Sequence, residues 1–493
     1  MSRCPMTAVA ITALLALSGV ACGAHVDRQP TPSTLLGTLG DPDGDGVLQR
    51  EAAEPLIDRT DLASRSPAQG TLGRFAQVSD AHLADEESPV RLEALDRLGA
   101  PFSSAFRPQE ALEPQVLTAA VRALDRQRVD AVVETGDLVD NDQANEYTQA
   151  LAVLHGGHVN PNSGPPGYQG VQSAASADPF FYRPDVDPPQ HPGLLGAAEQ
   201  PFSSPGLHAP WYPVAGNHDL LVAGILAPTA PLKALAVGSR RIVQPPRGLH
   251  LDETSSDLSA AALDGRPQAA RLADRLLREH RLGITARVPK DSRRHLLTPG
   301  AAVGRLRVAS GHGGAGPRLD YTFDIGHGLR AIVLDAVSRR GGSAGILRAD
   351  QLRWLTSALH EAGRRWVVVF SHQPLSSFPS GRRALALLDA HPRVLAAIAG
   401  HTHRNRIDPR RTAHGGYWLI TSTALVDYPQ QVRMYAARQT TGGAVLETWM
   451  VDTAPSPLAD TARALAYLDA QGGRPGGFAG RRVDRNVRLF VRG

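Results

Sequence analysis

The chain has 493 residues and is 42% apolar, which is enough to bury a sizeable core and excludes an intrinsically disordered protein. Its 52 Lys and Arg residues against 48 Asp and Glu give a net charge of only +4. This small excess is spread over the chain without a clustered basic face, so the sequence carries no nucleic-acid-binding signature.

The N-terminus has the pattern of an exported protein. Residues 1–21 begin with a short segment that carries one Arg and continue with the apolar run TAVAITALLALSGVA, which is too short to span a bilayer with margin. We therefore predict a signal peptide over residues 1–21. Cleavage before Cys22 would leave this residue as a possible lipid anchor, so we expect a cell-envelope lipoprotein or a secreted protein. At most one cysteine remains in the mature chain, which excludes an internal disulfide and a Cys-based metal site.

Residues 22–72 are polar and interrupted by Pro and Gly, which predicts a linker or an irregular N-terminal arm. Within it, DPDGDGVLQREA (41–52) is similar to a calcium-binding loop, with aspartates at positions 1, 3 and 5 and a glycine at position 6. Ala52 stands where a bidentate Glu should close the site. We therefore favour an ordinary Asp/Gly turn over a calcium site.

From residue 73 to 452, short apolar runs alternate with helical stretches, which predicts strands separated by crossover helices. The predicted strands lie within 74–83, 130–141, 211–219, 321–337 (an antiparallel pair), 365–375, 393–405 and 417–425, and the predicted helices are 114–127 and 349–363. The C-terminal segment 453–493 is predicted to contain a helix near 457–470 and a last strand at 487–491.

Polar side chains follow five of these predicted strands. They are Asp80 and His82, Asp137 and Asp140, Asn217 and His218, His372, and His401 and His403. In α/β sheets, ligands bind beyond the carboxyl ends of the strands, so we expect these side chains to converge. Their oxygen and imidazole donors suit Fe, Mn or Zn, and they are numerous enough for two metals if one carboxylate bridges them. Such a centre would bind a phosphate and activate a water.

Two stretches interrupt the framework. Residues 156–210 are rich in Pro, Gly and Ser, and residues 222–317 mix helical pieces with Arg-rich loops. Insertions at loop level commonly adapt a core fold to its substrate. We expect both insertions to lie near the mouth of the site, as a lid or wall.

The strand-end residues resemble the motifs of the calcineurin-like metallophosphoesterase superfamily. Its D-x-H, G-D-x-x-D, G-N-H-D/E, lone His and G-H-x-H motifs read here as SDAHL, GDLVD, GNHD, FSHQP and AGHTH, in the family's order. The segment SDAHLADEESPVRLEALD also resembles a poorly characterised actinobacterial subfamily. The resemblance implies a four-layer α/β/β/α sandwich of mixed sheets with loop insertions.

The resemblance also implies a role for each residue. Asp80, His82 and His403 would hold a first metal, Asn217, His372 and His401 a second, and Asp137 would bridge them. His218 would protonate the leaving-group oxygen or stabilise charge on the phosphoryl group. Asp140 would fix the tautomer of His218 and raise its pKa, and we expect Asp219 to orient the loop. The implied reaction is hydrolysis of phosphate mono- or diesters by a hydroxide bound to the dinuclear centre.

Two alternatives remain. The enzyme would instead be a cyclic-nucleotide-type phosphodiesterase or a nucleotidase if aromatic side chains, of which Tyr168, Phe180, Phe181 and Tyr182 are candidates, stack on a nucleobase. A non-catalytic envelope binding protein would retain the metal site without turnover, although the complete set of motifs counts against it. The GDLVD motif lacks the Tyr ligand of purple acid phosphatases, which argues against that branch.

Overall fold

The computed structural model describes residues 33–98, 105–244, 283–311, 316–472 and 476–493, which belong to one unit comprising residues 32–493. The predicted signal peptide and Cys22 lie outside the described residues. Among the described helices, none combines the length and the apolar character that a membrane crossing requires.

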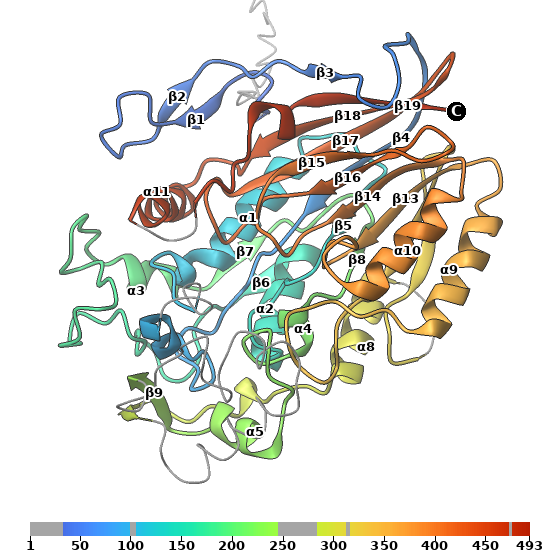
Figure 1. The fold of residues 1–493 in the computed structure, drawn as a ribbon. Helices are drawn as coiled ribbons and strands as arrows, with labels where there is room; N and C mark the ends of the chain where they lie inside the picture. The colour runs from blue at the N-terminus through green and yellow to red at the C-terminus, as the bar shows by residue number, and fades with distance from the viewer. Residues whose placement is uncertain (1–32, 99–104, 245–282, 312–315, 473–475) are drawn as a thin grey trace, which may run out of the picture. The chain divides into compact units, whose positions relative to one another are not determined.

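Two mixed β-sheets form the centre of this unit (Figure 1). The seven-stranded sheet has the order β3-β19-β18-β17-β4-β5-β8, and the six-stranded sheet has the order β11-β12-β13-β14-β16-β15. The bounds of the first are β3 Ile57–Arg59, β4 Ala68–Val78, β5 Ala131–Glu134, β8 Trp211–Pro213, β17 Gln431–Thr440, β18 Gly443–Asp452 and β19 Val487–Arg492. Those of the second are β11 Tyr321–Ile325, β12 Leu329–Leu334, β13 Trp366–Ser371, β14 Val394–Ala399, β15 Arg406–Arg410 and β16 Tyr417–Thr421.

Each sheet contains a block of parallel strands whose carboxyl ends share one edge. These blocks are β4-β5-β8 in the seven-stranded sheet and β12-β13-β14-β16 in the six-stranded sheet. Strands β13 (WVVVFS) and β14 (VLAAIA) are buried along their whole length, as expected for parallel strands covered on both faces. In β13, Val368 and Phe370 pack between the sheets, whereas Val367 and Val369 pack against helices.

Helices cover the outer face of each sheet. Helices α1 (Glu113–Leu124), α2 (Ala144–His155), α8 (Pro299–Ser310) and α11 (Pro457–Gln471) share a core with the seven-stranded sheet, and α9 (Ala349–Glu361) and α10 (Pro379–Asp389) share one with the six-stranded sheet. A third core lies between the two sheets. The predicted four-layer α/β/β/α sandwich is therefore confirmed.

The β17–β18 hairpin was not predicted from the sequence, although it forms the middle of the seven-stranded sheet. Strand β17 carries Arg433 in a fully buried position, where its guanidinium donates to Asn405 Oδ1 at 2.7 Å and to the Asp484 carbonyl at 2.8 Å. A charged residue that is buried through hydrogen bonds to distant parts of the chain breaks the apolar pattern by which strands are recognised.

The described part of the N-terminal arm contains more regular structure than the sequence suggested. Strands β1 (Thr38–Gly40) and β2 (Gln49–Glu51) form an antiparallel hairpin, and β3 pairs with β19 in the large sheet. The loop between β1 and β2 holds the three aspartates of the calcium-like motif. The carboxylate of Asp41 accepts N–H groups of residues 44, 45 and 46 at 2.8 to 3.1 Å, which is the hydrogen bonding of an Asp/Gly turn.

The two insertions are partly regular. The first contains β6 (Gly157–Val159), α3 (Leu194–Ala198) and β7 (Phe202–Ser204). The second contains α5 (Ala230–Ala236), β9 (Arg240–Gln244), β10 (Ile284–Arg287) and α8. Short helix α4 (Asn217–Leu220) precedes the second insertion and carries the GNHD motif.

Candidate metal centre

All seven predicted metal ligands lie directly beyond the carboxyl ends of parallel strands. In the seven-stranded sheet they follow β4, β5 and β8, and in the six-stranded sheet they follow β13 and β14. The residues are Asp80, His82, Asp137 and Asn217 from the first sheet, and His372, His401 and His403 from the second. The site therefore lies where the two sheets meet at one edge of the sandwich.

Five of these seven residues have left-handed backbone conformations, with φ between 47° and 67°. They are Asp80, His82, Asp137, His401 and His403. Such a conformation costs a non-glycine residue about 1 to 2 kcal/mol, so it persists where surrounding contacts enforce it. Here it turns the chain sharply at the strand end and brings the polar side chains back over the sheet edge.

One group of possible ligands consists of Asp80, His82 and His403, whose donor atoms lie within 4.8 Å of one another. The Nε2 atom of His403 is 3.3 Å from Asp80 Oδ1. The Nδ1 atom of His82 is 3.0 Å from Asp140 Oδ1, whereas its buried Nε2 has no hydrogen-bond partner within the described part of the chain. An unpartnered buried nitrogen is costly unless something binds it, and a metal ion would do so.

The second group consists of Asp137, His372 and His401, with Asn217 beside them. The Nδ1 atom of His372 is 2.8 Å from the Thr135 carbonyl, so it donates its proton there. Its Nε2 lies 3.0 Å from Asp137 Oδ2, 3.1 Å from Asn217 Oδ1 and 3.2 Å from His401 Nδ1.

This arrangement places acceptor atoms against one another. With its proton on Nδ1, neutral His372 presents a lone pair at Nε2 to a carboxylate oxygen and an amide oxygen. Such groups converge favourably only around a cation. Asp137 also approaches the first group, since its Oδ2 is 3.7 Å from His82 Nε2. The residues therefore fit two metal ions with Asp137 between them.

The charges of the site point the same way. Burial alone would lower the pKa of His372, but the carboxylates of Asp137 and Asp80 outweigh it and raise that pKa to about 9. In the same way, Asp80 and Asp427 raise the pKa of His403 to about 10 against the effect of burial. Buried carboxylates that raise the pKa of neighbouring imidazoles when no metal is bound also favour the binding of a metal cation between them.

His218 lies beside these groups with its side chain 22% exposed. Its Nδ1 is 2.9 Å from the carbonyl oxygen of Asp140 and 3.2 Å from Oδ1 of the same residue, so Asp140 fixes the proton on Nδ1. Burial disfavours the charged ring, but Asp137 and Asp140 outweigh it and raise the pKa of His218. At Gly224, at the start of the second insertion, a Cβ atom would lie 2.3 Å from His218 Nε2, so that segment forms a wall of the site.

The carboxylate of Asp219 holds the loop that carries Asp137. Its two oxygens accept the backbone N–H groups of Gly216, Asp137, Leu138 and Val139 at 2.8 to 3.2 Å. Asp219 thus binds two motif loops together through their backbone N–H groups. Burial and the nearby Asp137 carboxylate raise the pKa of Asp219 to about 7, against the lowering effect of these N–H donors.

Sequence reasoning missed the residues that support the ligands from behind. Asp427 contacts His403, and the buried Arg107 contacts Asp427. The buried Arg91 is 3.2 Å from Asp140 and 2.6 Å from Glu110. Asp427 also follows a predicted strand, so the strand-end rule that found the ligands would have found it too, had it been applied without a motif.

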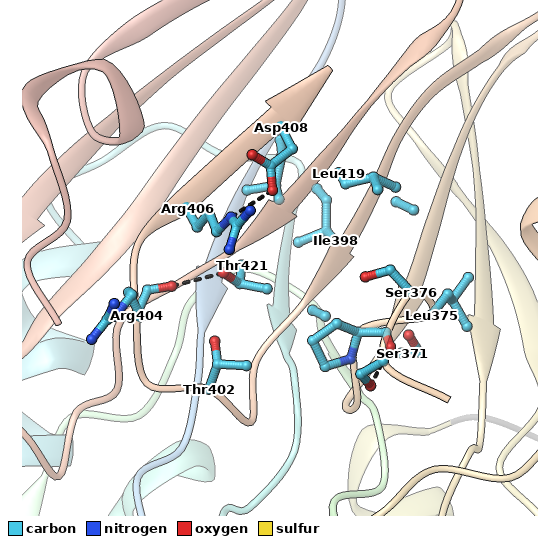
Figure 2. Close-up of a pocket in the computed structure, with 15 residues that line it drawn as sticks. Ser371, Leu375, Ser376, Ile398, Thr402, Arg404, Arg406, Asp408, Leu419 and Thr421 are labelled. Atoms are coloured by element: carbon cyan, nitrogen blue, oxygen red, sulfur yellow. Dashed lines mark hydrogen bonds and ion pairs between the residues drawn. The ribbon is translucent and has the colours of Figure 1, made fainter. Parts of the chain in front are cut away.

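A separate pocket of about 410 Å³ opens beside the site (Figure 2). It is lined by Leu375, Ile398 and Leu419 together with hydroxyl-bearing and charged residues. Leu419 also packs with the helix-covered core of the six-stranded sheet, so the pocket lies toward that face. Thr402, between two predicted ligands, contributes to its wall, but the ligands themselves are not among the described residues that line it.

Comparisons with known proteins were made for the whole chain. The family model for calcineurin-like phosphoesterases matches residues 73–405. Among solved structures, a dimetal phosphatase from Danio rerio has 15% identity, covers 78% of this chain and 100% of its own, and has a TM-score of 0.38. PhoD has 13% identity, coverage of 86% and 80%, and a TM-score of 0.32. The sulfate thiohydrolase SoxB of Thermus thermophilus, in complex with glycerol, has 12% identity, coverage of 84% and 62%, and a TM-score of 0.31. The search of curated proteins found no match.

Proposed function

The chain belongs to the calcineurin-like phosphoesterase family, and from this premise we propose that it hydrolyses phosphate mono- or diesters at a dinuclear metal centre. The observation that carries the proposal is the position of Asp137 Oδ2, which lies 3.0 Å from His372 and 3.7 Å from His82 and so reaches both ligand groups. When bound, two Fe, Mn or Zn ions would neutralise the charge of the phosphate ester and lower the pKa of the attacking water.

His218 is the proton donor in this proposal. Asp140 accepts the Nδ1 proton, so Nε2 is the ring nitrogen left to exchange a proton with the substrate. The raised pKa of His218 keeps a proton available on the imidazolium, which can pass from Nε2 to the leaving-group oxygen. The backbone N–H of His218 also donates to Asp137 Oδ1 at 2.8 Å, which fixes the proton donor relative to the proposed bridging carboxylate.

Two of the four aromatic residues considered for nucleobase stacking, Phe180 and Phe181, give that alternative no support. Phe181 is 1% exposed and packs against Phe106, so its ring is part of a core cluster. Phe180 is 40% exposed, but the guanidinium of Arg97 lies 4.2 Å from its ring centre. We therefore propose phosphate esters as the substrate class, with no requirement for a nucleobase.

The decisive experiment compares metal content with turnover in the chain lacking residues 1–21. Metal is measured after loading with Mn²⁺, Zn²⁺ or Fe²⁺, and hydrolysis is measured with aryl phosphate mono- and diesters. Asp137→Ala should lose both metal and activity, whereas His218→Ala should keep its metal and lose about 100-fold or more in rate. His327→Ala, in the exposed turn between β11 and β12, is the matched control and should keep both.

Each contrary result has a defined meaning. Full activity in both site variants would overturn the proposal. Two metals bound in the unaltered chain, without turnover of any ester tested, would identify a binding protein that retains the metal site.

We also propose export, on the basis of the N-terminal sequence alone. Cys22→Ser should release the full-length chain from a bacterial membrane fraction if Cys22 carries a lipid, and should change nothing if the protein is simply secreted. Retention of the unaltered full-length chain in the cytoplasm would contradict export.

A further inference from the structure

Among the described residues outside the motifs, Asp427 makes the shortest contact to a predicted ligand. Its Oδ2 is 2.5 Å from Nδ1 of His403, whose Nε2 faces Asp80 at 3.3 Å. The side chain of Asp427 is 5% exposed. Its Oδ1 accepts from Nε of Arg107 at 2.8 Å, and Arg107 is itself buried. A row of contacts therefore runs from Arg107 through Asp427 and His403 to Asp80.

The backbone around Asp427 is fixed to the ligand loops. Leu425 donates its N–H to the Ser79 carbonyl at 3.0 Å, and Val426 donates to the carbonyl of Asp80 itself at 3.1 Å. The side-chain amide of Gln109 donates to the Val426 carbonyl at 2.9 Å. Because the segment is bonded to the Asp80 loop, the carboxylate of Asp427 is held at a constant position relative to one ligand while it orients another.

A second buried Arg–Asp pair has the same form beside His82, another ligand of the first group. Arg91 is 3.2 Å from Asp140, which contacts His82 and His218. Glu110 joins the two pairs, since its Oε2 accepts from Arg91 at 2.6 Å and from the backbone N–H of Arg107 at 3.0 Å. His82 and His403, two ligands of the first group, are thus each supported by an aspartate that a buried arginine holds.

We propose that Asp427 is a positioning residue for the first metal and that Arg107 supports it. Asp427 holds the His403 proton on Nδ1, so the Nε2 lone pair is free and faces the metal position beside Asp80 and His82. The arginine keeps the carboxylate ionised and aligned. A carboxylate that accepts the remote N–H of a ligating imidazole fixes its tautomer and orientation and makes it a stronger donor. The inference rests on the proposed dinuclear centre.

The test measures metal binding in the chain lacking residues 1–21. Asp427→Ala should weaken Zn²⁺ binding at one of two sites by about 10- to 100-fold, and leave the other site unchanged. Asp427→Asn should lose less, because its amide oxygen can still accept the proton. The matched control is Asp389→Asn at the end of α10, where Asp389 pairs with Arg410 at 2.5 Å, and it should bind two metals normally.

Two further measurements separate positioning from a purely structural role. The absorption spectrum of the Co²⁺-loaded protein should change in Asp427→Ala, because the ring of one ligand is no longer oriented. Arg107→Met should weaken the same site by less, and the double variant should be no weaker than Asp427→Ala alone.

The possible failures are distinguishable. If the unaltered chain binds no metal, the proposed function fails. If it binds two and Asp427→Ala does so with unchanged affinity and Co²⁺ spectrum, this inference alone is overturned. A lower free energy of unfolding in urea for the metal-free Asp427→Ala variant, with unchanged metal binding, would also overturn this inference. Asp427 would then have only a structural role.

Discussion

The replacement Asp219→Asn tests whether a residue that touches no metal builds the metal centre. The substitution keeps the shape of the side chain and exchanges one acceptor oxygen for an NH₂ group. Asp219 Oδ2 accepts from Gly216 and Asp137, and Oδ1 accepts from Leu138 and Val139. Whichever oxygen is exchanged, two buried backbone N–H groups then face a donor.

The expected loss of stability follows from the two backbone N–H groups that lose their acceptor. Each buried donor left without an acceptor costs about 1 to 3 kcal/mol, so the free energy of unfolding should fall by about 4 kcal/mol. The loop that carries Asp137 should also lose its fixed position, which weakens metal binding. Urea denaturation of the metal-free protein at pH 8 measures the first effect, and Zn²⁺ titration of the folded variant measures the second.

Asp389→Asn provides the control for the substitution, because it makes the same exchange at the end of α10, where the carboxylate contacts Arg410 and Tyr417. A loss of less than about 1 kcal/mol in Asp219→Asn, with unchanged Zn²⁺ affinity, would refute the reasoning, because such a value matches a single exposed hydrogen bond.

Three further predictions concern the same site. In Gly216→Ala the new Cβ would lie 2.2 Å from the Asp137 backbone N, so we expect about 3 kcal/mol of destabilisation in urea and weaker metal binding. Tyr147→Phe removes a hydrogen bond of 2.7 Å to the Asp219 carbonyl and should lower the free energy of unfolding by about 1 kcal/mol. A melting temperature equal to that of the unaltered chain would contradict this. The pKa values of His372 (about 9) and His403 (about 10) lie above the unfolded value of 6.5, so their stabilisation of the metal-free chain is complete below pH 6.5 and is lost as pH rises through 9 to 10. The free energy of unfolding of chelator-treated protein, measured in urea, should therefore fall between pH 7 and 10, by about 3 kcal/mol for His372 alone. The metal-loaded protein should lack this fall.

The sequence was most informative where a short apolar run ended in polar residues. Strands β13 and β14 are continuous apolar segments, and the motif histidines follow them directly, so both the strands and the convergence of the ligands were predictable. Strand β17 was not, because Arg433 is buried by hydrogen bonds to groups about 30 and 50 residues away that no local pattern reveals. Asp427, the partner of His403, was missed for a different reason: it follows a predicted strand but belongs to none of the five motifs.

The buried Arg–Asp pairs show why the ligands need support that the motifs do not contain. Burying a charge pair is costly, and an apolar pair of similar volume would often be at least as stable. At Arg91–Asp140 and Arg107–Asp427, however, each aspartate also contacts imidazoles of the site. An apolar replacement would leave those imidazole protons without acceptors and the ring orientations unfixed. The charge pairs are therefore best explained by the geometry that they impose on the metal centre.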